Sequence, residues 1–339
     1  MNGRRWIRLG LVGGPAKEVS VCHARRAIRH RSARMSTIAD KRFILVTGKG
    51  GVGKTTVCAA LALACAARGK RVLVAMCNSK EGLSTLLGSN PIGPEVALAV
   101  ENVWAVNMHP ERAIEEYGTL VLHSRILYRT LFDNRYVRAF LRAIPGMQSW
   151  SMLGKAWWHT TETLADGSRR FDVVILDAPA TGHGLDMVRV PRTILDVVPP
   201  GILRRDAERA WSLLTDPEAT LVVLVTLAED MPITETIELA AGLADIGLPA
   251  GRLVVNAILP PLFSVEEREA LEALQIPASD DVGDAVLLSA RSRAIRERNQ
   301  ADCLKRLASQ LSQPTSYLPL VMDELGQVEV IRQLAHRLA

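Results

Sequence analysis

The residues best placed to do chemistry form one short loop, Gly48-Lys49-Gly50-Gly51-Val52-Gly53-Lys54-Thr55. Its glycines allow the backbone to wrap around an anion with the N–H groups pointing inward. The lysine and threonine at its end add a cation for phosphate oxygens and a hydroxyl that can ligate Mg²⁺. The spacing G-x-x-x-x-G-K-[ST] therefore predicts a phosphate-binding loop, with Lys54 on the β and γ oxygens and Thr55 on the metal.

Such a loop needs a strand before it and a helix after it. An apolar run at 43–47 predicts the strand, and residues 55–68 predict a helix whose N-terminus adds positive potential. Further strands are predicted at 71–75, 103–106, 172–176, 221–225 and 253–256. Continuous apolar runs, as opposed to alternating ones, indicate strands buried on both faces. The predicted fold class is therefore α/β, a mostly parallel doubly wound sheet of the P-loop type.

The strand rhythm stops between Val106 and Phe171, which is too long an interval for an ordinary crossover. We predict a helical insertion over about 108–170, divided by Pro145-Gly146. Trp150, Leu153, Trp157 and Trp158 fall at helical spacing there, beside Met147 and Met152. This pattern fits either the core of the insertion or an exposed apolar groove.

Two polar residues follow predicted strands directly. Asp177 ends the run at 172–176, where a carboxylate can hold the water shell of Mg²⁺. Asn256 ends the run at 253–256, and its amide can both donate and accept hydrogen bonds, as readout of an adenine ring requires.

Longer stretches add a family resemblance. The run Gly-Lys-Gly-Gly-Val-Gly-Lys-Thr-Thr at 48–56 resembles the deviant Walker A motif of partitioning and septum-site ATPases, the nitrogenase iron protein, and the arsenite-pump and tail-anchored-protein targeting ATPases. The run Asp-Ala-Pro-Ala-Thr-Gly-His-Gly-Leu at 177–185 resembles switch II of the last two in particular. With the stretches at 188–191, 225–229, 255–260 and 318–320, residues 41–339 resemble the bacterial anion-transporting-ATPase-like branch.

The resemblance implies ATP and Mg²⁺ as cofactors and a homodimer, or a heterodimer with a related ATPase. Lys49 would cross the dimer interface to the partner's phosphates, and Asn256 and Pro319 would flank adenine. The insertion would offer a surface to a protein client. The implied nucleotide-binding residues are Gly48, Gly50, Gly51, Val52, Gly53, Lys54, Thr55, Thr56, Asn256 and Pro319, the metal residues are Thr55 and Asp177, and the catalytic positions are Lys49, Lys54, Asp177 and Asn78.

Asn78 departs from the family pattern. Family members carry a water-orienting aspartate in the segment Asp-Pro-Ala-His-x-Leu-Ser, and alignment on Leu83-Ser84 places Asn78 there. An amide can hold water but cannot take its proton, and loss of a positioned base typically costs about 100- to 10,000-fold in rate. Three alternatives remain open. The chain hydrolyses ATP slowly, or it is a scaffold subunit that does not hydrolyse ATP and pairs with an active homologue. In the third, Glu81 substitutes for the missing base.

Several other features are explained by core packing or by solvated surface, without a role in a functional site. Cys58 and Cys65 are expected to pack as small apolar residues, and the cysteines contain no CxxC pair for zinc or site for arsenite. The arginines at 291, 293, 296 and 298 predict a solvated helix face or, alternatively, a phosphate-steering one. Residues 328–338 predict a terminal helix packed on the sheet or, alternatively, the membrane-surface helix of a positioning ATPase.

Charge is concentrated at the start of the chain. The protein has 339 residues and a formal charge of +5, but residues 1–34 contribute +8 and the remainder −3. We predict a basic, disordered extension over 1–40, either an arm for anionic surfaces or a segment without a folded role. The globular part is acidic, so no nucleic-acid partner is expected. The longest apolar run has 11 residues, so no membrane-spanning segment is expected. The five cysteines form no CxxC pair and fit a reducing compartment, so a cytoplasmic location is expected.

Overall fold

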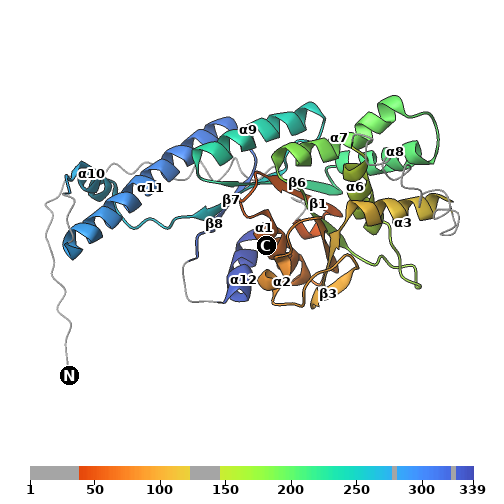
Figure 1. Ribbon diagram of the computed structural model, residues 1–339, viewed down its shortest axis with the longest axis horizontal. Helices are drawn as coiled ribbons and strands as arrows, with labels where there is room; N and C mark the ends of the chain where they lie inside the picture. The colour runs from red at the N-terminus through yellow and green to blue at the C-terminus, as the bar shows by residue number, and fades with distance from the viewer. Residues whose placement is uncertain (1–37, 123–145, 277–280, 322–325) are drawn as a thin grey trace, which may run out of the picture. The chain divides into compact units, whose positions relative to one another are not determined.

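The computed structural model describes residues 38–122, 146–276, 281–321 and 326–339. These contain an eight-stranded sheet of order β3-β4-β2-β5-β1-β6-β7-β8 (Figure 1). Neighbouring strands are parallel except for β3 and β4. The strands are β1 (Phe43–Gly48), β2 (Val72–Cys77), β3 (Ala97–Val100), β4 (Val103–Met108), β5 (Val173–Asp177), β6 (Thr220–Leu227), β7 (Arg252–Ile258) and β8 (Thr315–Pro319). The predicted α/β class and mostly parallel sheet are confirmed.

The central strands are buried on both faces because successive side chains point to opposite sides of the sheet. In β1, Phe43 and Leu45 join one apolar cluster, while Ile44 and Val46 join the other. All four are essentially inaccessible to water. The continuous apolar runs therefore serve two helical layers at once.

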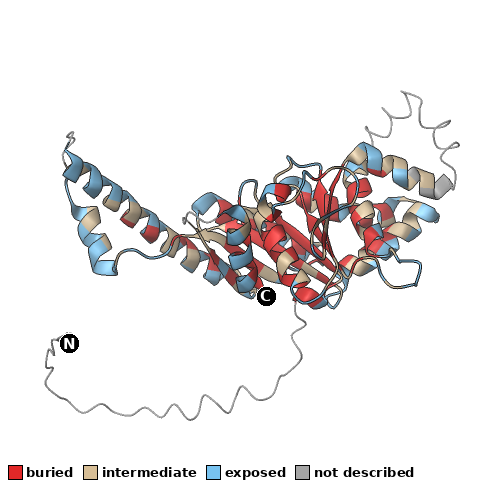
Figure 2. Ribbon diagram, turned by 90° about the horizontal axis from the view of Figure 1, so that it is seen from below, coloured by how far each residue is buried: buried red, intermediate tan, exposed pale blue. Residues whose placement is uncertain are grey.

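Helices cover both faces of the sheet (Figure 2). One layer contains α1 (Lys54–Ala66), α2 (Leu83–Leu87) and α12 (Gln327–Leu338). The other contains α6 (Met147–His159), α7 (Thr181–Val197), α8 (Ile202–Thr215), α9 (Asp230–Asp245) and α11 (Val282–Gln310). Two more helices pack mainly on other helices, α3 (Pro110–Leu122) on α6 and α10 (Val265–Ala273) on α11. A short 3-10 turn, η1 (Ile38–Asp40), precedes β1 and buries Ile38.

The terminal helix α12 lies against α1, and its apolar face is already occupied. Ile331, Leu334 and Leu338 are buried in the same cluster as α1. This is the packed arrangement expected from the helical spacing, and it leaves the apolar face unavailable to a membrane surface. No helix in the described ranges is long and apolar enough to cross a membrane.

Two strands were not among those predicted. β3 is short and largely exposed at the sheet edge, where it pairs antiparallel with β4, so it lacks the apolar run of a buried strand. β8 alternates buried and exposed residues at the opposite edge and ends at Pro319. Proline is tolerated there because an edge strand loses no second hydrogen-bonded neighbour.

Between β4 and β5 the described residues form α3, α6 and a small bridge from Thr163 to Arg169. Gly146 precedes α6 with φ of 79°, a left-handed conformation that suits glycine. Residues 123–145, including Pro145, lie outside the described part, as do residues 1–37 of the predicted extension. Ser264 and Glu267 form a capping box at the start of α10.

Candidate functional site

The candidate site lies where parallel strands end together. The carboxyl ends of β1, β2, β5 and β7 meet at one edge of the sheet. Each strand has, at or next to that end, a residue predicted to act on nucleotide or metal. The glycine-rich loop joins β1 to α1 there. Asp177 ends β5, Asn78 follows β2, and Asn256 lies near the end of β7.

Two glycines of the loop are required by its packing. Gly48 has φ of 152°, and a Cβ atom there would lie 2.2 Å from the carbonyl oxygen of Val225. Gly53 has φ of 89°, and a Cβ atom there would lie 2.2 Å from Nδ2 of Asn256. Any other residue would force the loop away from β6 and β7, so glycine holds the loop close to the sheet edge.

Lys54 lies back across the loop that precedes it. Its Nζ donates to the carbonyl oxygens of Gly48, at 3.2 Å, and of Lys49, at 3.0 Å. Burial lowers the pKa of Lys54, and the negative charge of Asp177 offsets part of that effect. The ammonium group therefore already occupies the concave side of the loop, where phosphate oxygens could replace the two carbonyl groups as acceptors.

Thr55 and Asp177 form the pair predicted for the metal. Thr55 Oγ1 donates to Asp177 Oδ2 over 2.6 Å, and Asp177 is buried. Burial raises the pKa of Asp177, against the opposing effects of the Thr55 hydrogen bond and the charge of Lys54. A hydroxyl and a carboxylate are hard oxygen donors of the kind Mg²⁺ binds, so the pair fits the predicted ion.

Cys58 lies beneath this pair, one turn into α1. Burial raises the pKa of the Cys58 thiol well above its ordinary range, and the neighbouring charge of Asp177 raises it further. A thiol that stays protonated is neither a good nucleophile nor a metal ligand. Cys58 and Cys65 are both buried in the core, as expected for small apolar side chains.

Lys49 pairs with a carboxylate of its own chain. Its Nζ lies 2.7 Å from Oε1 of Glu235 on α9, and both side chains are partly exposed. The sequence indicated no such partner, because contact between residues 49 and 235 depends on how α9 packs beside β1. In this structure Lys49 is therefore held at the rim of the loop.

Asn256 contacts the loop directly, which the sequence did not predict. Its Nδ2 donates to the carbonyl oxygen of Val52 over 3.0 Å, and Ala257 after it has φ of 53°. Pro319 lies on the adjacent strand, paired in register with Ile258. The structure therefore places the two residues expected to flank adenine on neighbouring strands at the same edge.

Asn78 is exposed directly after β2, with φ of 46°. Asparagine and aspartate tolerate this left-handed conformation better than most residues. Its backbone N–H donates to the carbonyl oxygen of Met108, which fixes the start of the segment. Glu81 is engaged elsewhere: its carboxylate accepts from the backbone N–H of Ser84 at 2.8 Å and from Ser84 Oγ at 2.6 Å. Glu81 thus caps α2 in this structure.

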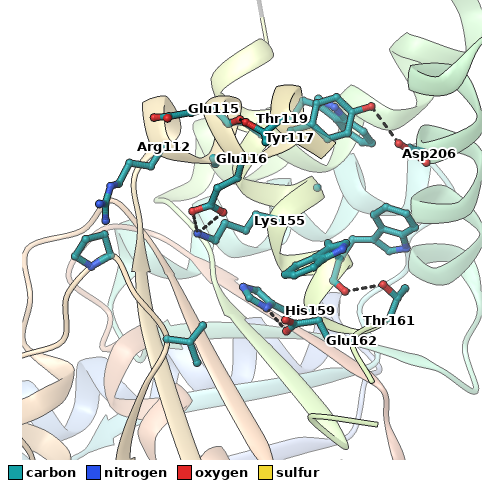
Figure 3. A pocket seen from close by; sticks show the side chains of 18 of the residues that line it. Arg112, Glu115, Glu116, Tyr117, Thr119, Lys155, His159, Thr161, Glu162 and Asp206 are labelled. Carbon is teal, nitrogen blue, oxygen red and sulfur yellow. Dashed lines mark hydrogen bonds and ion pairs between the residues drawn. The ribbon is translucent and has the colours of Figure 1, made fainter. Parts of the chain in front are cut away.

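A separate cavity of about 1120 Å³ lies between α3, α6, α8 and the segment before β3 (Figure 3). No residue of the glycine-rich loop lines it. Trp150 and Leu153 are buried, and Trp150 lines the cavity together with Trp157 and Trp158. Trp150 and Leu153 belong to the core of the inserted helices, and the use of the exposed part as a client groove stays a prediction. The cavity also holds pairs that the sequence did not reveal: Lys155 with Glu116, and His159 with Glu162.

Comparison with known proteins assigns the family. The model of the family described as anion-transporting ATPase matches residues 41–199 and 203–278, so the chain belongs to that family. It is 27% identical to ATPase BagA of Mycobacterium tuberculosis over 89% of this chain and 95% of that protein. It is 29% identical to an arsenical pump-driving ATPase of Escherichia coli, over 68% of this chain and 41% of the pump ATPase. ATPase GET3B of Arabidopsis thaliana is 23% identical over 73% of each chain.

Proposed function

We propose that the chain is an ATP-binding, magnesium-dependent nucleotide switch that hydrolyses ATP slowly. The observation that carries the proposal is the close set formed by Lys54, Thr55 and Asp177 around a loop of the deviant type. Backbone N–H groups of residues 50–56 would surround the phosphates, and Lys54 would exchange its carbonyl acceptors for β and γ oxygens. Thr55 and Asp177 would hold Mg²⁺, which neutralises phosphate charge.

The second part of the proposal concerns Lys49. In this structure Lys49 is neutralised by Glu235 of the same chain. We infer that nucleotide phosphates attract Lys49 away from Glu235 and across a dimer interface, since triphosphate carries more negative charge than one carboxylate. The second subunit is another copy of the chain. If the dimer binds nucleotide more tightly than the single subunit does, nucleotide binding would favour the dimer and rearrange the inserted helices. A protein client would dock on those helices.

Asn78 favours a second candidate function. Because no carboxylate stands at this position and Glu81 caps α2, the chain can bind ATP without a positioned base for water. A regulatory or scaffold subunit that pairs with an active homologue would have this property. Negligible turnover by the purified chain, with tight MgATP binding, would favour that candidate over the slow switch.

The direct test is equilibrium binding of MgATP to wild type and Lys54→Ala. We expect at least a tenfold loss of affinity, about 1.4 kcal/mol or more, because a charge-assisted contact to phosphate disappears. Chelation of Mg²⁺ should weaken wild-type binding as well. Lys305→Ala is the matched control, since the Lys305 side chain is 79% exposed and forms an ion pair with Asp302 of the same helix. Equal affinities for both variants would refute the phosphate role of Lys54.

A further inference from the structure

The N-terminal part of α11 exposes apolar side chains around its whole circumference. Over residues 281–290 every residue except Asp284 and Ala290 is exposed. The exposed side chains there include four large apolar ones: Val282, Val286, Leu287 and Leu288. Val282 is 76% and Val286 62% exposed, values typical of charged surface residues. Much of the apolar area of this segment therefore stays in contact with water within the described chain, which indicates an interaction surface.

α10 extends the same surface. It packs chiefly on α11, and it adds the exposed Val265 and the adjoining Leu274. We call residues 265–276 and 281–290 the arm. Figure 1 shows α10 beside α11 at the end of the structure away from α3, and Figure 2 shows how little of the arm is buried. The cavity among the inserted helices includes no arm residue, so the two surfaces are separate.

The charge of the arm selects among possible occupants. It contains one basic residue, Arg268, against six acidic residues, Glu266, Glu267, Glu269, Glu272, Asp281 and Asp284, a net charge of −5. Four arginines of α11, at positions 291, 293, 296 and 298, follow the arm directly. Arg293 pairs with Glu297, and Arg298 pairs with Glu272 of the arm, so five of the six acidic residues are not engaged by these two arginines. A surface of this sign repels anionic lipid headgroups and the arm of a second copy. A cationic partner with its own apolar face is complementary to it.

The arm is fixed to the sheet at its base. Glu297 accepts a hydrogen bond from the backbone N–H of Leu262 at 2.9 Å. Gln300 accepts from the N–H of Leu259 at 2.8 Å and donates to its carbonyl oxygen at 3.1 Å. The segment between β7 and α10 is therefore tied to α11 on both sides. A surface held this way is presented with little conformational entropy to lose on binding.

We propose that the arm binds a partner protein through a basic amphipathic helix. Leucine-type side chains of that helix pack on Val282, Val286 and Leu287, and its lysines or arginines face the acidic residues of α10. This is the helix-in-groove mode of recognition, in which apolar anchors supply affinity and charge supplies specificity. The inference is independent of nucleotide chemistry, because no residue of the glycine-rich loop takes part.

The test measures fluorescence anisotropy of a labelled Leu/Lys amphipathic helical peptide with the full chain. The double variant Val286→Ser, Leu287→Ser removes the anchors, and Glu269→Lys reverses one charge. We expect each to weaken binding at least tenfold relative to wild type, and a Leu/Glu peptide with the same apolar face to bind at least tenfold more weakly than the Leu/Lys one. Circular dichroism and thermal unfolding establish that each variant remains folded.

Matched controls lie elsewhere on the surface. Leu98→Ser with Val197→Ser removes two side chains that are 61% and 71% exposed, and Glu101→Lys reverses a charge outside the arm. These variants should bind the Leu/Lys peptide within about twofold of wild type. Equal losses in controls and arm variants, or equal binding of both peptides, would overturn the proposal. So would arm-dependent sedimentation with anionic vesicles or arm-dependent self-association, since each identifies a different occupant.

Discussion

Asn78 is the residue on which the rate of the proposed cycle depends. It occupies a left-handed backbone position that an aspartate also tolerates, so the substitution Asn78→Asp introduces a carboxylate with little strain. We expect about a 100-fold or greater rise in kcat, with MgATP affinity nearly unchanged, because a base that accepts the proton of water is restored. Steady-state hydrolysis measures this.

The control for that substitution is its neighbour. Ser79→Asp adds the same charge one residue along the exposed segment, and it should leave kcat within about threefold of wild type. If Asn78→Asp is no faster than Ser79→Asp, another group activates water. A wild type that already turns over rapidly would point to the same conclusion.

Local residue patterns predicted the site better than its contacts. The loop, Asp177 and Asn256 were identified because their chemistry lies in short motifs at the ends of buried strands. The bond from Asn256 to Val52 and the ion pair of Lys49 with Glu235 were not predicted, since they join residues 204 and 186 positions apart. Only the packing of strands and helices brings such residues together.

Among the elements, the base of the arm depends on one buried carboxylate. Glu297 is 2% exposed, and it pairs with Arg293 at 2.8 Å while accepting hydrogen bonds from the segment that enters α10. Burial alone would raise the pKa of Glu297, but Arg293 and the backbone N–H groups of Leu262 and Phe263 outweigh it and lower the pKa below the ordinary 4.5. The arginines at 291, 293, 296 and 298 are therefore not only a solvated helix face, because Arg293 holds the buried carboxylate of Glu297.

Glu297→Gln should lower the free energy of unfolding at neutral pH by about 1–3 kcal/mol, the usual range for losing charge-assisted hydrogen bonds. Because the folded-state pKa lies below the unfolded one, this contribution is complete above about pH 5 and is lost as pH falls through the folded-state pKa. Urea unfolding at several pH values should show the difference between wild type and variant shrinking on acidification. A difference that is absent at neutral pH, or that does not change with pH, would contradict this assignment.

The sequence predicted the strands that are buried on both faces, but it did not predict the strands that are partly exposed. Six strands follow from continuous apolar runs that fill both helical layers. β3 and β8 lie at the two edges of the sheet, where one side lacks a neighbouring strand and the sequence is correspondingly mixed. The arm was also unexpected, because its apolar residues at helical spacing normally indicate a buried face.

At the scale of the whole molecule, the central claim is that MgATP joins two subunits through Lys49. A loop of this type places one lysine on the nucleotide of its own subunit and, by family resemblance, the other on the nucleotide of its partner. In the described residues Lys49 is neutralised by Glu235, so a single subunit leaves its bound triphosphate without this second cation. In the proposed dimer the partner would supply it, which would link nucleotide occupancy to dimerisation.

Sedimentation velocity with and without MgATP tests this claim most directly, applied to wild type and Lys49→Ala at the same concentration. We expect wild type to be a monomer without nucleotide and a dimer with MgATP. For Lys49→Ala we expect retained nucleotide binding but at least a tenfold weaker dimer, since a charge-assisted contact across the interface is lost. A wild type that remains monomeric in saturating MgATP would contradict the dimeric switch, and a Lys49→Ala variant that dimerises like wild type would remove Lys49 from it.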